Sequence, residues 1–212
     1  MTQASIEIAF LLASLALLAI YRMLHARRAR LDPSTSTRAL HDRIRSDWVA
    51  AMTKSGTDRG ILAVQTLRNS VMAASFMAST SALALAGTLG FASQADSLAA
   101  AWHRDHALAM ASALFPLKVF LLLGAFFVAF LMFSLSIRLY NHASYAIVLP
   151  GEGEAVARYI NRAGRMYGDG LRVFYMAFPV VAWLFDATML LAATAGVLWI
   201  RWHLDTADLP RD

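Results

Sequence analysis

The stretch 108–137, LAMASALFPLKVFLLLGAFFVAFLMFSLSI, decides the fold of this chain. Its only charged residue is Lys118. An α-helix rises 1.5 Å per residue, so about 20 apolar residues cross a hydrocarbon core of roughly 30 Å. Three further apolar stretches of sufficient length lie at 4–24, 70–92 and 173–200. The sequence therefore predicts an all-α membrane protein, built as a four-helix transmembrane bundle with cytosolic helical extensions.

The composition agrees with a membrane protein. Of the 212 residues, 58% are hydrophobic and 16% are charged, against about one half and one quarter in a typical soluble domain. The net charge of +5 favours basic loops on one side of a membrane over nucleic-acid binding, because no nucleic-acid recognition motif accompanies it. The chain has no cysteine, which excludes disulfides and thiolate metal sites.

The positive charges predict the topology. Ten Lys and Arg residues lie within 22–68 and five within 138–172. Three lie on the opposite side of the membrane, namely Arg104, Arg201 and Arg211. Because Lys and Arg collect in cytoplasmic loops, we expect the loops 25–69 and 138–172 inside and both termini outside. Residues 1–212 then form a single multi-pass domain, which we expect in the bacterial inner (plasma) membrane.

Each predicted cytoplasmic loop contains a helix. Within about 37–55, apolar residues recur every four positions, the spacing of an amphipathic helix. These residues are Leu40, Ile44, Trp48 and Met52. The helix either packs beneath the bundle or lies in the lipid headgroup layer. The second loop holds a basic helix over about 152–167.

Two charged residues fall inside the predicted spans. Lys118 and Asp186 both lie near the middle of the membrane when residues are counted from the ends of their stretches. A central charge costs about 2.5–3.5 kcal/mol to insert, so such residues face the bundle interior and often pair. We therefore expect a Lys118–Asp186 ion pair. It either fixes the register of two helices or forms a binding or relay site for an ion or proton.

A second set of candidates lies at the cytoplasmic ends of the predicted spans. The set comprises Arg68, Asn69, Arg138, Tyr140, His142 and Arg172. Arginines at such positions commonly reach toward lipid headgroups. Alternatively, Arg68, Arg138 and Arg172 come together from three helices and bind an anion or a lipid phosphate.

Three segments resemble a known family. They are LAVQTLRNSVMA at 62–73, LSIRLYNHAS at 135–144, and the segment 170–185 with GLRVFY, Phe178-Pro179 and WLF. Together they are similar to the membrane proteins that carry the domain of unknown function numbered 599. Lys118 also matches a lysine early in that family's third span.

The resemblance covers about 45–190 and implies a four-span membrane protein without naming a reaction. This chain departs from the family pattern after WLF, where Asp186-Ala187 stands in place of Gly-Pro. A partner for Lys118 at position 186 would therefore be peculiar to this sequence.

Two classes of function remain open at this point. The first is a small channel or transporter for an ion or small solute, formed as a homo-oligomer because four spans enclose little volume. The alternative is a non-transporting membrane scaffold or anionic-lipid-binding protein that contacts lipids on the cytoplasmic side. We expect no enzyme, cofactor or metal site, since the chain has no HExxH, GxSxG or phosphate-loop motif and no clustered carboxylates.

Overall fold

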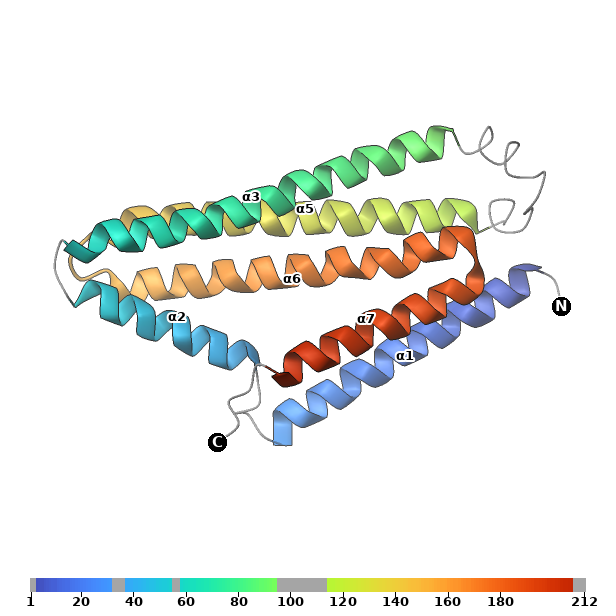
Figure 1. The fold of residues 1–212 in the computed structure, drawn as a ribbon, viewed down its shortest axis with the longest axis horizontal. Coiled ribbons are helices and arrows are strands. Elements are labelled where there is room, and N and C mark those ends of the chain that lie inside the picture. Colours follow the sequence, from blue (N-terminus) through green and yellow to red (C-terminus); the bar gives the residue numbers. More distant parts are fainter. Residues whose placement is uncertain (1–2, 32–36, 55–57, 95–113, 208–212) are drawn as a thin grey trace. The chain divides into compact units, whose positions relative to one another are not determined.

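The structure is a computed structural model that describes residues 3–31, 37–54, 58–94 and 114–207, and every regular element in these ranges is an α-helix (Figure 1). The prediction of an all-α protein is confirmed for this part of the chain. The helices are α1 (Gln3–Leu31), α2 (Thr37–Thr53), α3 (Asp58–Ser93), α5 (Phe115–Ala146), α6 (Gly153–Phe185) and α7 (Ala187–Ala207).

Three of these helices are long and apolar enough to cross a membrane. The candidate spans are Ala4–Arg28 in α1, Arg59–Ser93 in α3 and Phe115–Ala146 in α5. They carry many exposed large apolar side chains, such as Leu12 and Phe120, which suit contact with lipid. The first three predicted spans thus correspond to helices, and the chain has the features of an integral membrane protein.

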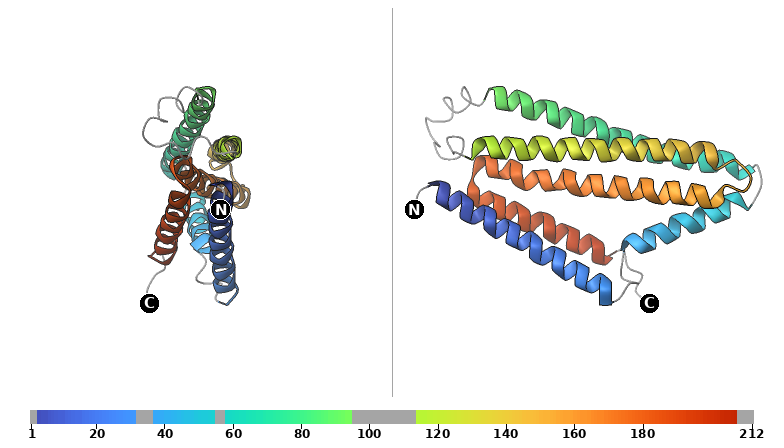
Figure 2. Two further views of the ribbon diagram at one scale, coloured as in Figure 1. Left: turned by 90° about the vertical axis from the view of Figure 1, so that its right-hand side faces the viewer. Right: turned by 180° about the vertical axis from the view of Figure 1, so that it is seen from behind.

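The prediction of a fourth, continuous span over 173–200 is wrong. Helix α6 ends at Phe185 and α7 begins at Ala187, which divides the apolar stretch at Asp186. The Asp186 carboxylate accepts hydrogen bonds from the backbone nitrogen and the hydroxyl of Thr188, at 2.7 and 2.6 Å. It thereby caps α7, whose first N–H groups have no partner within the helix. The chain turns back at this cap (Figures 1 and 2).

The chain forms two compact units, and each draws on segments far apart in sequence. The first unit comprises residues 1–35, 83–127 and 173–212. The second unit comprises residues 36–82 and 128–172. The boundaries between them fall inside α3, α5 and α6, so each of these helices contributes one part to each unit.

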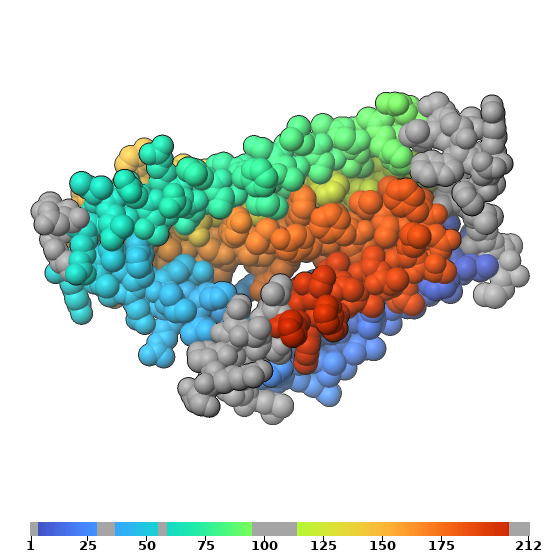
Figure 3. Space-filling view, viewed as in Figure 1, coloured from blue at the N-terminus to red at the C-terminus, as the bar shows by residue number. Residues whose placement is uncertain are grey.

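In the first unit, α7 packs along α1, and their atoms adjoin in the space-filling view (Figure 3). The ring of Tyr21 in α1 meets the ring of Trp202 in α7 edge-on, with 6.3 Å between centroids. Arg28 lies over Trp202 and Arg201 lies over Tyr21, at 5.5 and 5.4 Å from the ring centroids. Because these four residues come late in both helices, α1 and α7 run in the same direction.

The second unit has a core to which α2, α3, α5 and α6 all contribute. Val49, Leu67, Tyr140 and Ile160 are buried there, one from each helix. Trp48 and Met52 of α2 pack against the same core, which favours the packed arrangement over the headgroup layer. Ile44, predicted on the same apolar face, is 55% exposed. Helices α5 and α6 approach closely at Gly170. A Cβ at Gly170 would lie 2.8 Å from Cε1 of Phe133.

Candidate functional site

A buried ion pair joins α1 to α5 in the first unit. The Nζ of Lys118 lies 3.2 Å from Oε2 of Glu7, and the two side chains are 0% and 4% exposed. Taking either charge out of water alone would be costly, so each depends on the other for compensation. The partner of Lys118 is therefore a carboxylate of the first apolar stretch.

Lys118 also holds the end of α6. Its ammonium donates a hydrogen bond of 3.2 Å to the backbone oxygen of Trp183 and lies 4.9 Å from the centroid of the Trp183 ring. The last carbonyls of a helix lack partners within the helix and carry its negative end. The Lys118 ammonium satisfies one of these carbonyls, so the Lys118 side chain connects α5 to both α1 and α6.

The predicted ion pair between Lys118 and Asp186 is not the pairing found in the structure. Asp186 is exposed and its carboxylate accepts hydrogen bonds from Thr188. The acid that pairs with Lys118, Glu7, was missed. The signal that could have found it was its position inside the apolar stretch 4–24, where an acid needs a compensating charge as much as a lysine does.

The pair also lies nearer the helix ends than predicted. Counting from residue 108 put Lys118 near the middle of a span, but α5 begins at Phe115, so Lys118 is in its first turn. Trp183 is in the last turn of α6, and Glu7 is in the second turn of α1. The charges therefore meet where three helix ends gather.

Two buried polar groups of the first unit have no hydrogen-bond partner among the described residues. They are Nε1 of Trp183 and Oγ of Ser14, both buried. Ser14 follows Glu7 by seven residues, or about two turns, on the same face of α1. Unpaired buried polar groups are rare in folded proteins and commonly mark places where water or an ion binds.

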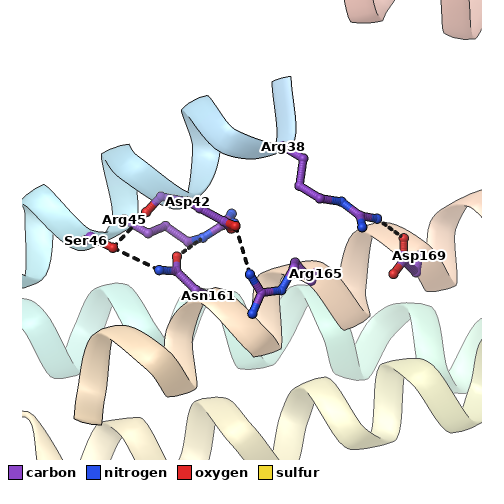
Figure 4. Close-up of polar contacts among 7 residues, drawn as sticks. All are labelled: Arg38, Asp42, Arg45, Ser46, Asn161, Arg165 and Asp169. Atoms are coloured by element: carbon purple, nitrogen blue, oxygen red, sulfur yellow. Dashed lines mark hydrogen bonds and ion pairs between the residues drawn. The ribbon is translucent and has the colours of Figure 1, made fainter. Parts of the chain in front are cut away.

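A network of polar contacts joins α2 to α6 in the second unit (Figure 4). Asp42 accepts hydrogen bonds from Arg45 and, at 2.9 Å, from Arg165. Asn161 accepts one from Arg45 at 3.0 Å and donates one to Ser46 at 2.9 Å. We call these residues, together with the ion pair of Arg38 and Asp169, the α2–α6 seam.

The seam lies beside an apolar part of α5. The hydroxyl of Ser136 donates to the backbone oxygen of Ala163 at 2.9 Å, and the rings of Phe133 and Tyr167 are 5.6 Å apart. These two contacts set α5 and α6 antiparallel, with 133–136 beside 163–167. Along the seam, three arginines share two aspartates, and these contacts join α2 to α6.

The predicted cluster at the cytoplasmic ends is only partly brought together. Arg68 and Asn69 are exposed on α3, whereas Tyr140 is buried in the core of the second unit. Arg172 pairs with Asp169 at 2.8 Å. None of these four residues lines the cavity that holds the remaining two, Arg138 and His142.

Arg138 and His142 border a cavity of about 300 Å³ between α5 and α6. Arg162 adds a third basic side chain, and the ring of Tyr159 stacks on His142 with 6.0 Å between centroids. Leu135, Leu139 and Met166 form the apolar wall. Arg162 and Tyr159 were absent from the predicted cluster, although their helix was predicted to be basic.

Among the residues that the structure describes, no three His, Asp or Glu side chains lie together as metal ligands would. The sequence matches the model of one family, a protein of unknown function, DUF599, over residues 9–209. No curated protein and no solved structure matches the chain. The resemblance predicted from three segments is thereby confirmed, and the function has to follow from the residues themselves.

Proposed function

This chain belongs to the DUF599 family of proteins of unknown function, and we propose that it is a membrane transport protein for an ion or small solute. The Lys118–Glu7 pair is its gate. The observation that carries this proposal is a buried ammonium and carboxylate, 3.2 Å apart, in a unit that also contains a buried apolar cluster of Leu122, Phe126, Ala177 and Leu184.

Such a pair responds to small changes in charge. Removing one partner of a buried ion pair costs about 3–5 kcal/mol, because the other charge is left uncompensated. Protonation of Glu7, or an anion that binds Lys118, would unbalance the pair in the same way. The contacts that Lys118 makes to α1 and α6 would then weaken together, and the unpaired groups of Trp183 and Ser14 offer hydrogen bonds to an entering ion or water.

The proposed topology has five crossings, with the end of α7 in the cytoplasm. The parallel course of α1 and α7 supports it, since the basic end of α1 fixes the side on which α7 ends. The charge distribution supports it as well. Adding Arg201 and Arg211 to the fifteen residues of the two basic loops gives seventeen on the cytoplasmic side, against Arg104 alone outside.

The homo-oligomer expected from the sequence stays a prediction. A gate buried within one subunit supports a path through each subunit, whereas the sequence alone favoured a path between subunits. Membrane lipids, anionic on the cytoplasmic side, stay predicted partners.

Flux through liposomes tests the proposal. Purified chain would be reconstituted and the decay of H⁺, K⁺ and Cl⁻ gradients recorded with fluorescent probes. We expect at least one gradient to decay faster than in empty liposomes. The double variant Lys118→Met with Glu7→Leu should change that rate at least tenfold, because the gate no longer carries charge.

The matched control removes a charge pair of the same kind from the surface. Arg43→Gln with Asp47→Asn breaks an exposed pair at 3.7 Å, and its flux should equal that of the unmodified chain. Equal decay of all three gradients with and without the protein would contradict transport of these ions. Unchanged flux in the folded Lys118→Met, Glu7→Leu variant would contradict the gate.

The second candidate function is a non-transporting, anionic-lipid-binding scaffold. It is favoured by the basic cavity between α5 and α6, which has no acidic residue in its lining. A scaffold would carry no flux in liposomes, and its double variant at positions 7 and 118 would differ from the unmodified chain only in stability. The same reconstitution therefore separates the two functions.

A further inference from the structure

Two arginines, Arg138 and Arg162, line the cavity of the second unit. Other arginines of α2 and α6 form ion pairs: Arg158 with Glu154, Arg165 with Asp42, and Arg172 with Asp169. In the part of the chain that the structure describes, neither Arg138 nor Arg162 forms an ion pair. They lie on facing helices at one cavity, together with His142. Like charges held this close repel each other unless an anion lies between them.

The position of the cavity along α5 points to the kind of anion. Arg138 directly follows the apolar run that ends at Ile137, which is the depth at which phospholipid phosphates are found. Leu135 and Leu139 supply an apolar wall on the same helix, and Met166 extends it on α6. The cavity is therefore basic at one side and apolar at the other, as the headgroup end of a lipid requires.

We propose that this cavity binds a phosphate group, held by Arg138 and Arg162, with His142 and Tyr159 beside it. The planar guanidinium group donates paired hydrogen bonds that fit phosphate oxygens. A phosphodiester carries a single negative charge, which offsets one arginine, whereas a phosphate monoester or inorganic phosphate carries about −1.5 to −2 at pH 7 and can offset both. The ligand is either an anionic phospholipid, whose chain follows the apolar wall, or a soluble phosphate compound. This inference is independent of transport by the Lys118–Glu7 gate.

Binding by the full chain in detergent tests the proposal. Native mass spectrometry would count retained phosphatidylglycerol and, as a zwitterionic comparison, phosphatidylcholine. Calorimetry would measure inorganic phosphate. We expect phosphatidylglycerol to bind at least tenfold more tightly than phosphatidylcholine. The double variant Arg138→Gln with Arg162→Gln should reduce its affinity at least tenfold, because both anchoring groups are lost.

Two further variants separate the site from general charge and from misfolding. Arg43→Gln with Arg158→Gln removes the same charge at exposed positions and should leave phosphatidylglycerol affinity within twofold. Arg138→Lys with Arg162→Lys keeps the charge but loses the paired donors, and should give an intermediate affinity. Thermal unfolding of each variant would verify that the helices remain folded.

Each outcome of these binding measurements supports or overturns the proposed phosphate site. Arginine-dependent binding of phosphatidylglycerol alone identifies a lipid site. Arginine-dependent binding of inorganic phosphate, without selectivity for the anionic lipid, identifies a soluble phosphate ligand. Equal loss in the cavity variant and in the Arg43, Arg158 control would overturn the proposal, since the effect would then be one of net charge. Undiminished binding in the folded cavity variant would overturn it as well.

Discussion

At the scale of single residues, Asp186 caps a helix, whereas the sequence predicted that it would pair with Lys118 inside the membrane. The Thr188 hydroxyl and then its backbone N–H donate to the carboxylate, and these hydrogen bonds lower the pKa of Asp186 below its ordinary value. A carboxyl whose pKa is lowered in the folded state adds stability above its unfolded pKa, which is near 4. That stability is lost as the pH falls through the folded pKa.

This predicts a pH dependence that an amide would lack. Asp186→Asn can still cap a helix but cannot titrate. Relative to this variant, the melting temperature of the unmodified chain in detergent should fall between about pH 5 and pH 2 and stay constant between pH 6 and pH 8. Asp186→Ala should cost about 0.5–2 kcal/mol at neutral pH. If the melting temperatures of the unmodified chain and of Asp186→Asn change in parallel across the acid range, the charge of the Asp186 carboxylate does not stabilise the cap.

The sequence identified Lys118 as a buried charge but not its partner. Its apolar surroundings made a compensating acid necessary on physical grounds. The choice between Asp186 and Glu7 depends on which helices meet, and local sequence does not contain that information. The depth of Lys118 in the membrane was misjudged, because the apolar stretch begins at 108 whereas α5 begins at Phe115.

At the scale of elements, apolar length predicted that α1, α3 and α5 are helices, because a run of this length has to form a helix in lipid. Their bounds were predicted less well, since α3 begins at Asp58 and not near 70. The break at Asp186 was missed because one polar residue hardly changes the mean hydropathy of 173–200. A signal was nevertheless available. The family pattern has Gly-Pro at this place, and Gly-Pro is typical of a helix end. This chain has Asp186-Ala187 there, and the helix breaks where Asp186 caps α7.

The α2–α6 seam gives a prediction at this scale. Asp42 compensates both Arg45 and Arg165, so Asp42→Asn would leave two cations without their carboxylate. We expect a loss of about 1–3 kcal/mol in the stability of the second unit. Amide hydrogen exchange over 37–53 should become faster, because α2 separates from α6 more often. Asp47→Asn, at a position with a 74% exposed side chain, should change exchange little.

At the scale of the whole molecule, the predicted cytoplasmic cluster does not come together at one place. Tyr140 lies in the core of the second unit, Arg172 pairs with Asp169, and Arg138 and His142 line the cavity. Arg68 and Asn69 are exposed on α3. Arg138 and His142 were recognised from their place at the end of an apolar run. Arg162 joins them only through the antiparallel register of α5 and α6, which the spacing within either helix does not reveal. The sequence therefore predicted the kind of site but only some of its residues.

Topology is testable by labelling single cysteines in intact cells, since the natural chain has none. With five crossings, an impermeant thiol reagent should label cysteine at Gln94 but not at Lys54 or Asp205. The unlabelled positions should react after the membrane is permeabilised. Labelling at Asp205 before permeabilisation would restore the four-crossing arrangement, with the end of α7 outside.

The most direct test of the central claim is a double-mutant cycle at Lys118 and Glu7, measured as the free energy of unfolding in detergent. If the two residues form the buried pair, Lys118→Met and Glu7→Leu should each cost about 3–5 kcal/mol, and the double variant should regain most of that loss. A double variant whose loss equals the sum of the two single losses would show that the residues do not interact, and would contradict the pair and the gate built on it.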